Sequence, residues 1–123
     1  MLTEGLSHTS TITVSPDKTA AAVGSGDMLV LATPMMMALM ENAAMLATAG
    51  ELPEGMTTVG GHIESSHIKP SKIGAEVKAT ATLTKVEGKK LYFDIVATMN
   101  DAVIGQGTHL RFIVNKEKFM NNL

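Results

Sequence analysis

The sequence predicts an α+β fold in which a curved antiparallel sheet of about five strands wraps around one long central helix. The helix is indicated by the stretch from Met28 to Gly50, which is rich in methionine, alanine and leucine and contains one charged side chain. The strands are indicated by the clearest period in the chain, because apolar and polar residues alternate from Ala75 to Thr84. Turn signals at 87–89 and 100–101 separate this strand from two more, which is typical of an antiparallel meander.

The start and the end of the helix are marked by local signals. Thr33 followed by Pro34 predicts the start, because a threonine oxygen can cap the free N–H groups of the first turn and proline fits the first helical position. Gly50 predicts the end. The residues between them are apolar on nearly all sides, which indicates a buried helix.

The other segments read as strands or loops. A short β-branched strand is predicted at 9–14, and a second strand is predicted at 18–23 after the turn signal Ser15-Pro16-Asp17. A flexible loop at 24–27 then leads to the helix. Later strands are predicted at 57–68, 75–84, 91–99 and 103–114. A sheet of this kind has two free edges, and pairing of such edges between copies predicts a homodimer or a higher oligomer.

Composition limits the class of protein. A chain of 123 residues predicts a single domain over 1–123 with no linker. The net charge of −2, from 10 basic and 12 acidic side chains, predicts binding neither to nucleic acid nor to an anionic membrane surface. Pro34 and Glu41 interrupt the apolar stretch, so we expect a buried helix and no membrane span. The lack of cysteine and of a signal-peptide pattern predicts a cytoplasmic protein.

Glu41 is the most informative residue, because it is the charged side chain inside the apolar helix. An ionised carboxylate without partners in an apolar interior is costly, and carboxylates in such places gather at functional sites. The alternative interpretation is that Glu41 lies on the wet face of the helix, as most helical glutamates do.

Two histidines lie on the predicted strand at 57–68. Their odd spacing places His62 and His67 on opposite faces, with His67 on the face of Ile63 and His62 on the face of Glu64. The pair His62 and Glu64 lacks a third ligand in sequence reach, so no metal site is predicted. A histidine beside an apolar helix also has a purely structural interpretation, and the Gly60-Gly61 pair has one as a bulge or bend of the sheet.

A hydroxyl, a carboxylate and an imidazole near one apolar helix provide the groups needed for acyl transfer or hydrolysis. In this chain these groups are Thr33, Glu41 and His67. The motifs of serine hydrolases, nucleotide-binding loops and zinc proteases are absent. Composition by itself does not show that the three groups converge.

Several segments together resemble a known family. They are ATPM at 32–35, ENA at 41–43, TVGGHI at 58–63, SH at 66–67 and IGQGTHLRF at 104–112. Over nearly the whole chain the sequence resembles the fluoroacetyl-CoA thioesterase-like branch of the hot-dog superfamily. The resemblance implies a hot-dog fold, a dimer, and an acyl-CoA bound near the subunit interface.

The resemblance also implies roles for individual residues. Thr33, Glu41 and His67 match the catalytic threonine, glutamate and histidine of the family. Gly60 matches a glycine whose backbone helps to bind the acyl group, and Arg111 falls at a ligand-side arginine. Glu41 would act either as a general base or as a nucleophile.

Further binding residues follow from these positions. Backbone N–H groups of Gly60 and Gly61 would stabilise the oxyanion, and Lys69 and Lys72 would meet the phosphates of coenzyme A. No cofactor is expected apart from coenzyme A as part of the substrate. The family's namesake has a phenylalanine-containing lid, whereas residues 24–27 contain no aromatic side chain.

We therefore expect an acyl-CoA thioesterase that hydrolyses a short or medium acyl thioester, without selectivity for the fluoroacetyl group. The first alternative is a non-catalytic dimer that binds acyl-CoA or another small ligand. The second is a different small α+β fold in which Glu41 is structural.

Overall fold

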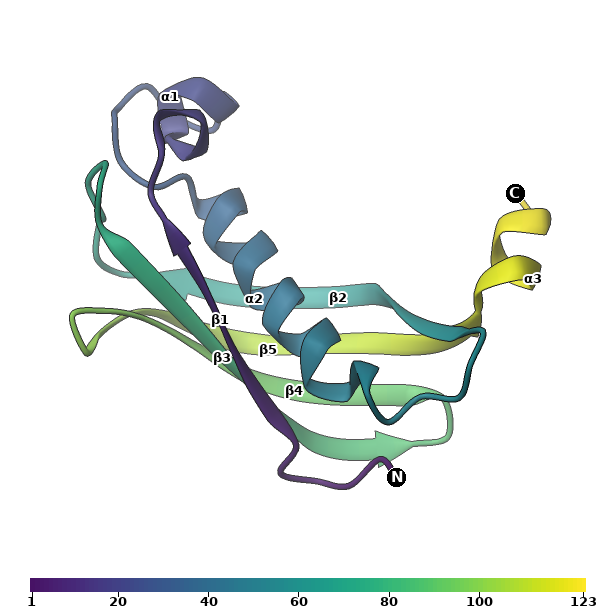
Figure 1. Cartoon of the computed structure of the whole chain (residues 1–123). Helices are drawn as coiled ribbons and strands as arrows, with labels where there is room; N and C mark the ends of the chain where they lie inside the picture. The colour runs from purple at the N-terminus through teal and green to yellow at the C-terminus, as the bar shows by residue number, and fades with distance from the viewer.

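The computed structural model describes all 123 residues. Its elements in chain order are β1 (Ser7–Thr13), a 3₁₀ turn (Pro16–Lys18), α1 (Ala20–Val23), α2 (Thr33–Ala49), β2 (Met56–His67), β3 (Glu76–Glu87), β4 (Lys90–Met99), β5 (Ala102–Asn115) and α3 (Lys116–Asn121). The five strands form one antiparallel sheet in the order β1-β3-β4-β5-β2, and α2 lies across its concave face (Figure 1). The predicted α+β arrangement is confirmed.

Helix α2 occupies the predicted range, but its start differs in one detail. Pro34 lies in the first turn as expected, and Gly50 is the C-terminal cap. The N-cap residue is Ala32, and no side chain caps the helix. The prediction that Thr33 is the capping residue is therefore wrong, because Thr33 is already the first helical residue and its hydroxyl bonds elsewhere.

The core forms between α2 and the inward faces of the strands. From Val77 to Leu83 on β3 and from Leu91 to Ala97 on β4 every second residue is buried, as the alternation predicts. Alanine is the most frequent residue type in this core, and Ala79 of β3 pairs directly with Ala97 of β4. Small side chains let the helix approach the sheet closely, while Met36 and Met40 fill the remaining space from the helix.

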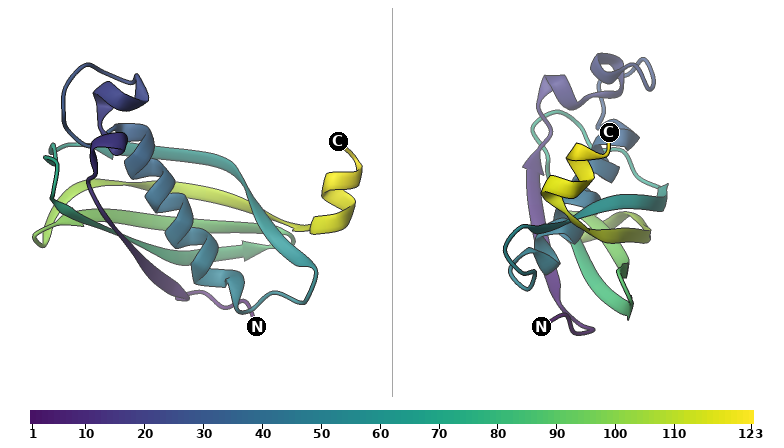
Figure 2. Two further views of the ribbon diagram at one scale, coloured as in Figure 1. Left: turned by 45° about the horizontal axis from the view of Figure 1, so that its top comes forward. Right: turned by 90° about the vertical axis from the view of Figure 1, so that its right-hand side faces the viewer.

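One prediction of local structure is wrong, and one helix was not predicted. Residues 18–23 are the end of the 3₁₀ turn and helix α1, where a strand was expected. The reason is local, because the Thr19 side chain accepts a hydrogen bond from the Ala22 N–H at 3.2 Å and so caps an alanine run that favours helix. Helix α3 was not anticipated and projects from the end of β5 (Figure 2).

The position of α2 leaves one side of the sheet less covered. The helix packs mainly against β1 and β3, whereas β2 and β5 lie farther along the concave face (Figure 2). Strand β2 is an edge of the sheet and pairs with β5 alone. Its register shifts between Gly60 and His62, which confirms the bulge interpretation of the glycine pair. No helix of the chain is both long and apolar enough to cross a membrane.

Candidate active site

The first cluster joins the start of α2 to the end of β2. Thr33 Oγ1 and His67 Nδ1 are 2.7 Å apart, so the hydroxyl and the imidazole form a hydrogen bond between the two elements. The other ring nitrogen, Nε2, is buried and has no hydrogen-bond partner. Burial lowers the pKa of His67 from its ordinary value, because removing water disfavours the charged imidazolium. A neutral imidazole with one free nitrogen is suited to accept or pass a proton.

A pocket opens beside this pair. It has a volume of about 270 Å³, and Thr33, His67 and Lys69 are among its lining residues. Lys72 does not reach this pocket and lines a neighbouring one, of about 580 Å³, on the other side of Pro70. Both lysines are exposed and neither has an ion-pair partner. They therefore present free positive charge around the cluster.

The second cluster lies farther along α2. Glu41 is half-buried, which rejects the simple wet-face interpretation. Its carboxylate lies against the backbone of Gly60, where a Cβ atom would be 2.9 Å from Glu41 Oε2. The same hypothetical Cβ would be 3.6 Å from Nη1 of Arg111. A glycine is needed here because any side chain would displace the carboxylate.

Arg111 is buried on the inward face of β5, with 6% of its surface exposed. Its Nε donates to Thr58 Oγ1 at 2.8 Å, and its Nη2 donates to the Thr58 carbonyl oxygen at 3.0 Å. Burial lowers the pKa of Arg111, and the negative charge of Glu41 opposes that effect. The two groups influence each other without forming a direct ion pair.

Sequence reasoning gave no role to His109, which is a third member of this cluster. Its ring is buried, and it is hydrogen-bonded to the His62 carbonyl oxygen at 2.6 Å and to Arg111 Nη1 at 3.2 Å. Burial is the main cause that lowers its pKa. The available signal was its phase on the strand, since His109 and Arg111 are two residues apart and so share the inward face.

The two clusters do not meet within one chain. Glu41 follows Thr33 by eight residues on the same helix, which corresponds to a rise of about 12 Å. No hydrogen bond joins Glu41 to Thr33 or to His67. One chain therefore brings Thr33 to His67 and Glu41 to Gly60, but no contact joins these two clusters.

Gly61 differs from Gly60 because successive residues of a strand face opposite sides of the sheet. A Cβ at Gly61 would lie 2.2 Å from the ring of Phe112, so this glycine makes room for an aromatic side chain. His62 and Glu64, for which no metal site is predicted, contact each other, with Nε2 and Oε1 at 3.0 Å, and both side chains are exposed. No group of three or more potential metal ligands converges in the structure.

The two buried histidines predict how stability depends on pH. Because the folded pKa values of His67 and His109 lie below the ordinary 6.5, the unfolded chain takes up protons first as the pH falls. We expect the free energy of unfolding to decrease as the pH falls below 6.5 towards the lowered values, with no contribution from these groups well above 6.5. Urea denaturation at about pH 7.5, 6.5 and 5.5 measures this, and His109→Gln should reduce the change. Equal stability at all three values would contradict the prediction.

Comparisons with known proteins show which sequences and structures this chain resembles. A sequence model described as fluoroacetyl-CoA-specific thioesterase matches residues 14–117. The fluoroacetyl-CoA thioesterase of Streptantibioticus cattleyicolor is 38% identical over 90 residues, which is 73% of this chain and 65% of that protein. The match thus spans less than two thirds of this relative's length.

Solved structures match over nearly the full length. A variant of the fluoroacetyl-CoA thioesterase in complex with acetyl-CoA superposes with a TM-score of 0.93 at 31% identity, covering 98% of this chain and 96% of that one. A thioesterase superfamily member from Thermus thermophilus gives a TM-score of 0.91 at 27% identity, covering 98% and 90%. The predicted hot-dog fold is confirmed.

Proposed function

Because the chain belongs to the family of fluoroacetyl-CoA-specific thioesterases, we propose that it hydrolyses a short or medium acyl-CoA thioester to a free acid and coenzyme A. The observation that carries the proposal is the placement of the Glu41 carboxylate against Gly60, beside the buried guanidinium of Arg111. A carboxylate, exposed backbone and a fixed positive charge are thereby gathered in one half-buried place.

Glu41 is the central catalytic group in this proposal. It either removes a proton from water as a general base or attacks the thioester carbonyl carbon to form an anhydride that water then hydrolyses. Both routes place negative charge on the carbonyl oxygen in the transition state. Arg111, with its Nη1 close to Gly60, and the backbone N–H groups of Gly60 and Gly61 are the donors proposed to stabilise that charge.

Thr33 and His67 supply the second half of the chemistry. The departing thiolate of coenzyme A needs a proton or a donor, and His67 is hydrogen-bonded to the Thr33 hydroxyl at the mouth of a pocket. The hydroxyl orients the ring, and Nε2, which is buried and has no partner within the chain, is the nitrogen proposed to protonate the leaving group. Lys69 lines the same pocket and Lys72 the next one, where both would meet coenzyme A phosphates.

A homodimer is part of the proposal because it joins the two clusters. Strand β2 is a 12-residue edge whose outer N–H and C=O groups have no partner strand. Antiparallel pairing of two β2 edges sets the His67 end of one strand near the Gly60 end of the other when the two-fold axis passes close to the middle of β2. The Thr33–His67 pair of one subunit then faces Glu41 of the partner subunit.

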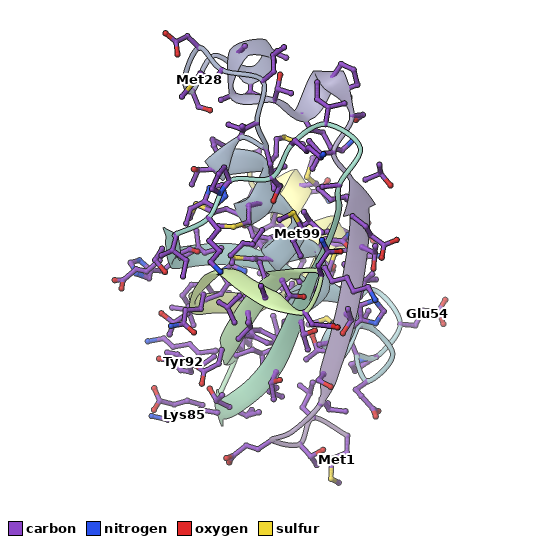
Figure 3. The ribbon with its side chains drawn as sticks, turned by 90° about the vertical axis from the view of Figure 1, so that its left-hand side faces the viewer. Met1, Met28, Glu54, Lys85, Tyr92 and Met99 are labelled. Atoms are coloured by element: carbon purple, nitrogen blue, oxygen red, sulfur yellow. The ribbon has the colours of Figure 1, made fainter.

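The acyl group is proposed to be short or medium in length, without fluoroacetyl selectivity. The loop before α2 carries no aromatic residue at 24–27. It exposes Met28 and Leu29 instead, at 67% and 65%, and Figure 3 shows Met28 at the tip of this loop. Flexible apolar side chains of this kind adapt to different acyl groups.

Free-thiol release from a panel of acyl-CoAs tests the proposed function. The panel runs from acetyl and fluoroacetyl through butyryl, octanoyl and palmitoyl to benzoyl thioesters. Release from the short and medium members well above the buffer rate supports the thioesterase. Calorimetric binding of the same thioesters without release would support the non-catalytic binding dimer instead, and neither release nor binding would reject both.

A further inference from the structure

His109 occupies a position in which only one protonation state satisfies its neighbours. It is 2% exposed, so its ring nitrogens must find hydrogen-bond partners within the protein rather than in bulk water. Its Nδ1 lies 2.6 Å from the His62 carbonyl oxygen, which can only accept, and therefore Nδ1 carries the proton and donates. Its Nε2 lies 3.2 Å from Arg111 Nη1, which can only donate, and therefore Nε2 is the acceptor. The ring is held neutral, in the Nδ1–H tautomer.

The same ring connects two parts of the proposed site. The His62 carbonyl follows the bulge that displaces the backbone of β2 after Gly60. Arg111 is the buried cation whose Nη1 lies beside Gly60 and near Glu41. One imidazole therefore ties the bulge on β2 to the guanidinium on β5.

Arg111 has a defined orientation because hydrogen bonds to Thr58 and His109 engage all three of its guanidinium nitrogens. Thr58 accepts from Nε and Nη2, and His109 accepts from Nη1. Of the five N–H groups of a guanidinium, these three bonds leave one on Nη1 and one on Nη2 without an acceptor. The Thr58 bonds hold one edge of the planar guanidinium and the His109 bond holds Nη1, so the two residues together fix the direction of the free N–H of Nη1.

We propose that His109 is a positioning residue that acts through Arg111, directing its free Nη1–H into the space between Gly60 and Glu41. This inference deepens the proposed thioesterase function and rests on it for the identity of the reacting group. Cε1 of His109 also borders this space, 3.4 Å from the hypothetical Cβ of Gly60, but both ring nitrogens are already hydrogen-bonded, so the ring offers no N–H to the reacting atoms. Its contribution is to keep the guanidinium in the orientation that the developing oxyanion requires.

The charged surroundings of His109 agree with a neutral ring. Arg111 on β5 faces it directly and opposes protonation, and the His62 side chain on β2 adds to this effect. Glu41 on α2 favours protonation but is outweighed by burial. On the β4 side the neighbour is Phe93, whose ring centroid lies 6.2 Å from that of His109 and which carries no charge.

Two substitutions separate the two hydrogen bonds of His109. In His109→Asn, the amide nitrogen can still donate to the His62 carbonyl oxygen, but no atom remains at the position of Nε2 to accept from Arg111. In His109→Gln, the longer side chain places its amide oxygen where Nε2 was and keeps the acceptor. We expect kcat to fall about tenfold to a hundredfold in His109→Asn, with KM changed by less than about twofold, and most of kcat to return in His109→Gln.

A purely structural role predicts a different pattern. In that case both variants lose thermal stability together, and kcat falls only in proportion to the folded fraction. On the background of Arg111→Lys, which lacks the planar fork, adding His109→Asn should change kcat by less than about twofold. A kcat for His109→Asn within about twofold of the unsubstituted enzyme, in folded protein, would overturn the proposal.

A spectroscopic readout keeps the inference testable if the chain has no thioesterase activity. Imidazole ¹⁵N chemical shifts of the unsubstituted protein near pH 7 distinguish the two neutral tautomers from the cation. The Nδ1–H tautomer is expected for His109. An Nε2–H tautomer or a charged ring would overturn the inference, whereas absence of thiol release with the expected tautomer would reject the proposed function alone.

Discussion

Replacing Glu41 with glutamine is expected to lower thioester turnover by about a hundredfold to ten-thousandfold, which is the usual contribution of a general base. The amide has nearly the same shape and still fits against Gly60, so the fold and the affinity for acyl-CoA should persist. Thiol release measures kcat, and calorimetry measures binding. Glu54→Gln is the matched control, because it removes the same charge at an exposed position away from the site (Figure 3). Unchanged turnover in Glu41→Gln would reject the mechanism.

Mixing two inactive variants tests whether the site is shared between subunits. In the proposed dimer, Glu41→Gln and His67→Ala each inactivate both sites of a homodimer. A mixed dimer retains one intact site, formed by Glu41 of one chain and His67 of the other. Random exchange should therefore restore about a quarter of the full activity, because half of the dimers are mixed and each has one working site of two. No recovery after confirmed subunit exchange would place each site within one subunit.

Replacing Gly107 with alanine is expected to destabilise the fold by at least about 3 kcal/mol. A Cβ at this position would lie 1.8 Å from the carbonyl oxygen of Glu64, which is backbone and cannot move away as a flexible side chain would. Gly107 pairs with Ser65 in the ladder between β5 and β2, so the clash would force the two strands apart. Urea denaturation measures the loss, and failure to obtain folded protein would agree with it.

Gly50→Ala is the control for the Gly107 substitution. Gly50 has a φ of −72°, which any residue adopts, and no atom lies within 4 Å of its hypothetical Cβ. We expect its free energy of unfolding to change by less than about 0.5 kcal/mol. A loss below about 1 kcal/mol in Gly107→Ala would show that β2 can shift along its edge without cost, and it would contradict the tight β2–β5 register.

Much of the fold followed from the sequence because it depends on local patterns. The alternation from Ala75 to Thr84 requires one dry face of a strand, and that face is buried in the structure. The turn at Asn100 and Asp101 has positive φ values of 52° and 62°, which asparagine and aspartate tolerate better than most residues. These signals lie within a few residues of the features they specify, so one sequence is sufficient to read them.

The prediction from local sequence was wrong at residues 18–23, where a strand signal and a helix signal compete. Residues 18–23 have a composition that fits an edge strand, but Thr19 caps the alanine run and the segment becomes a helix. A cap depends on one hydrogen bond that a backbone N–H donates to a side-chain oxygen three residues earlier, and its strength against strand pairing depends on whether a partner strand is present.

The sequence by itself determined the buried helix, the meander and the presence of a carboxylate inside the apolar layer. Only the tertiary structure decided which side chains meet. Thr33 bonds to His67 across 34 residues, and His109 reaches the His62 carbonyl across 47. Contacts of this kind depend on strand register and on the bulge after Gly60, which shifts every following residue of β2 relative to β5. Register is a property of two strands together, and the periodicity of either strand alone does not contain it.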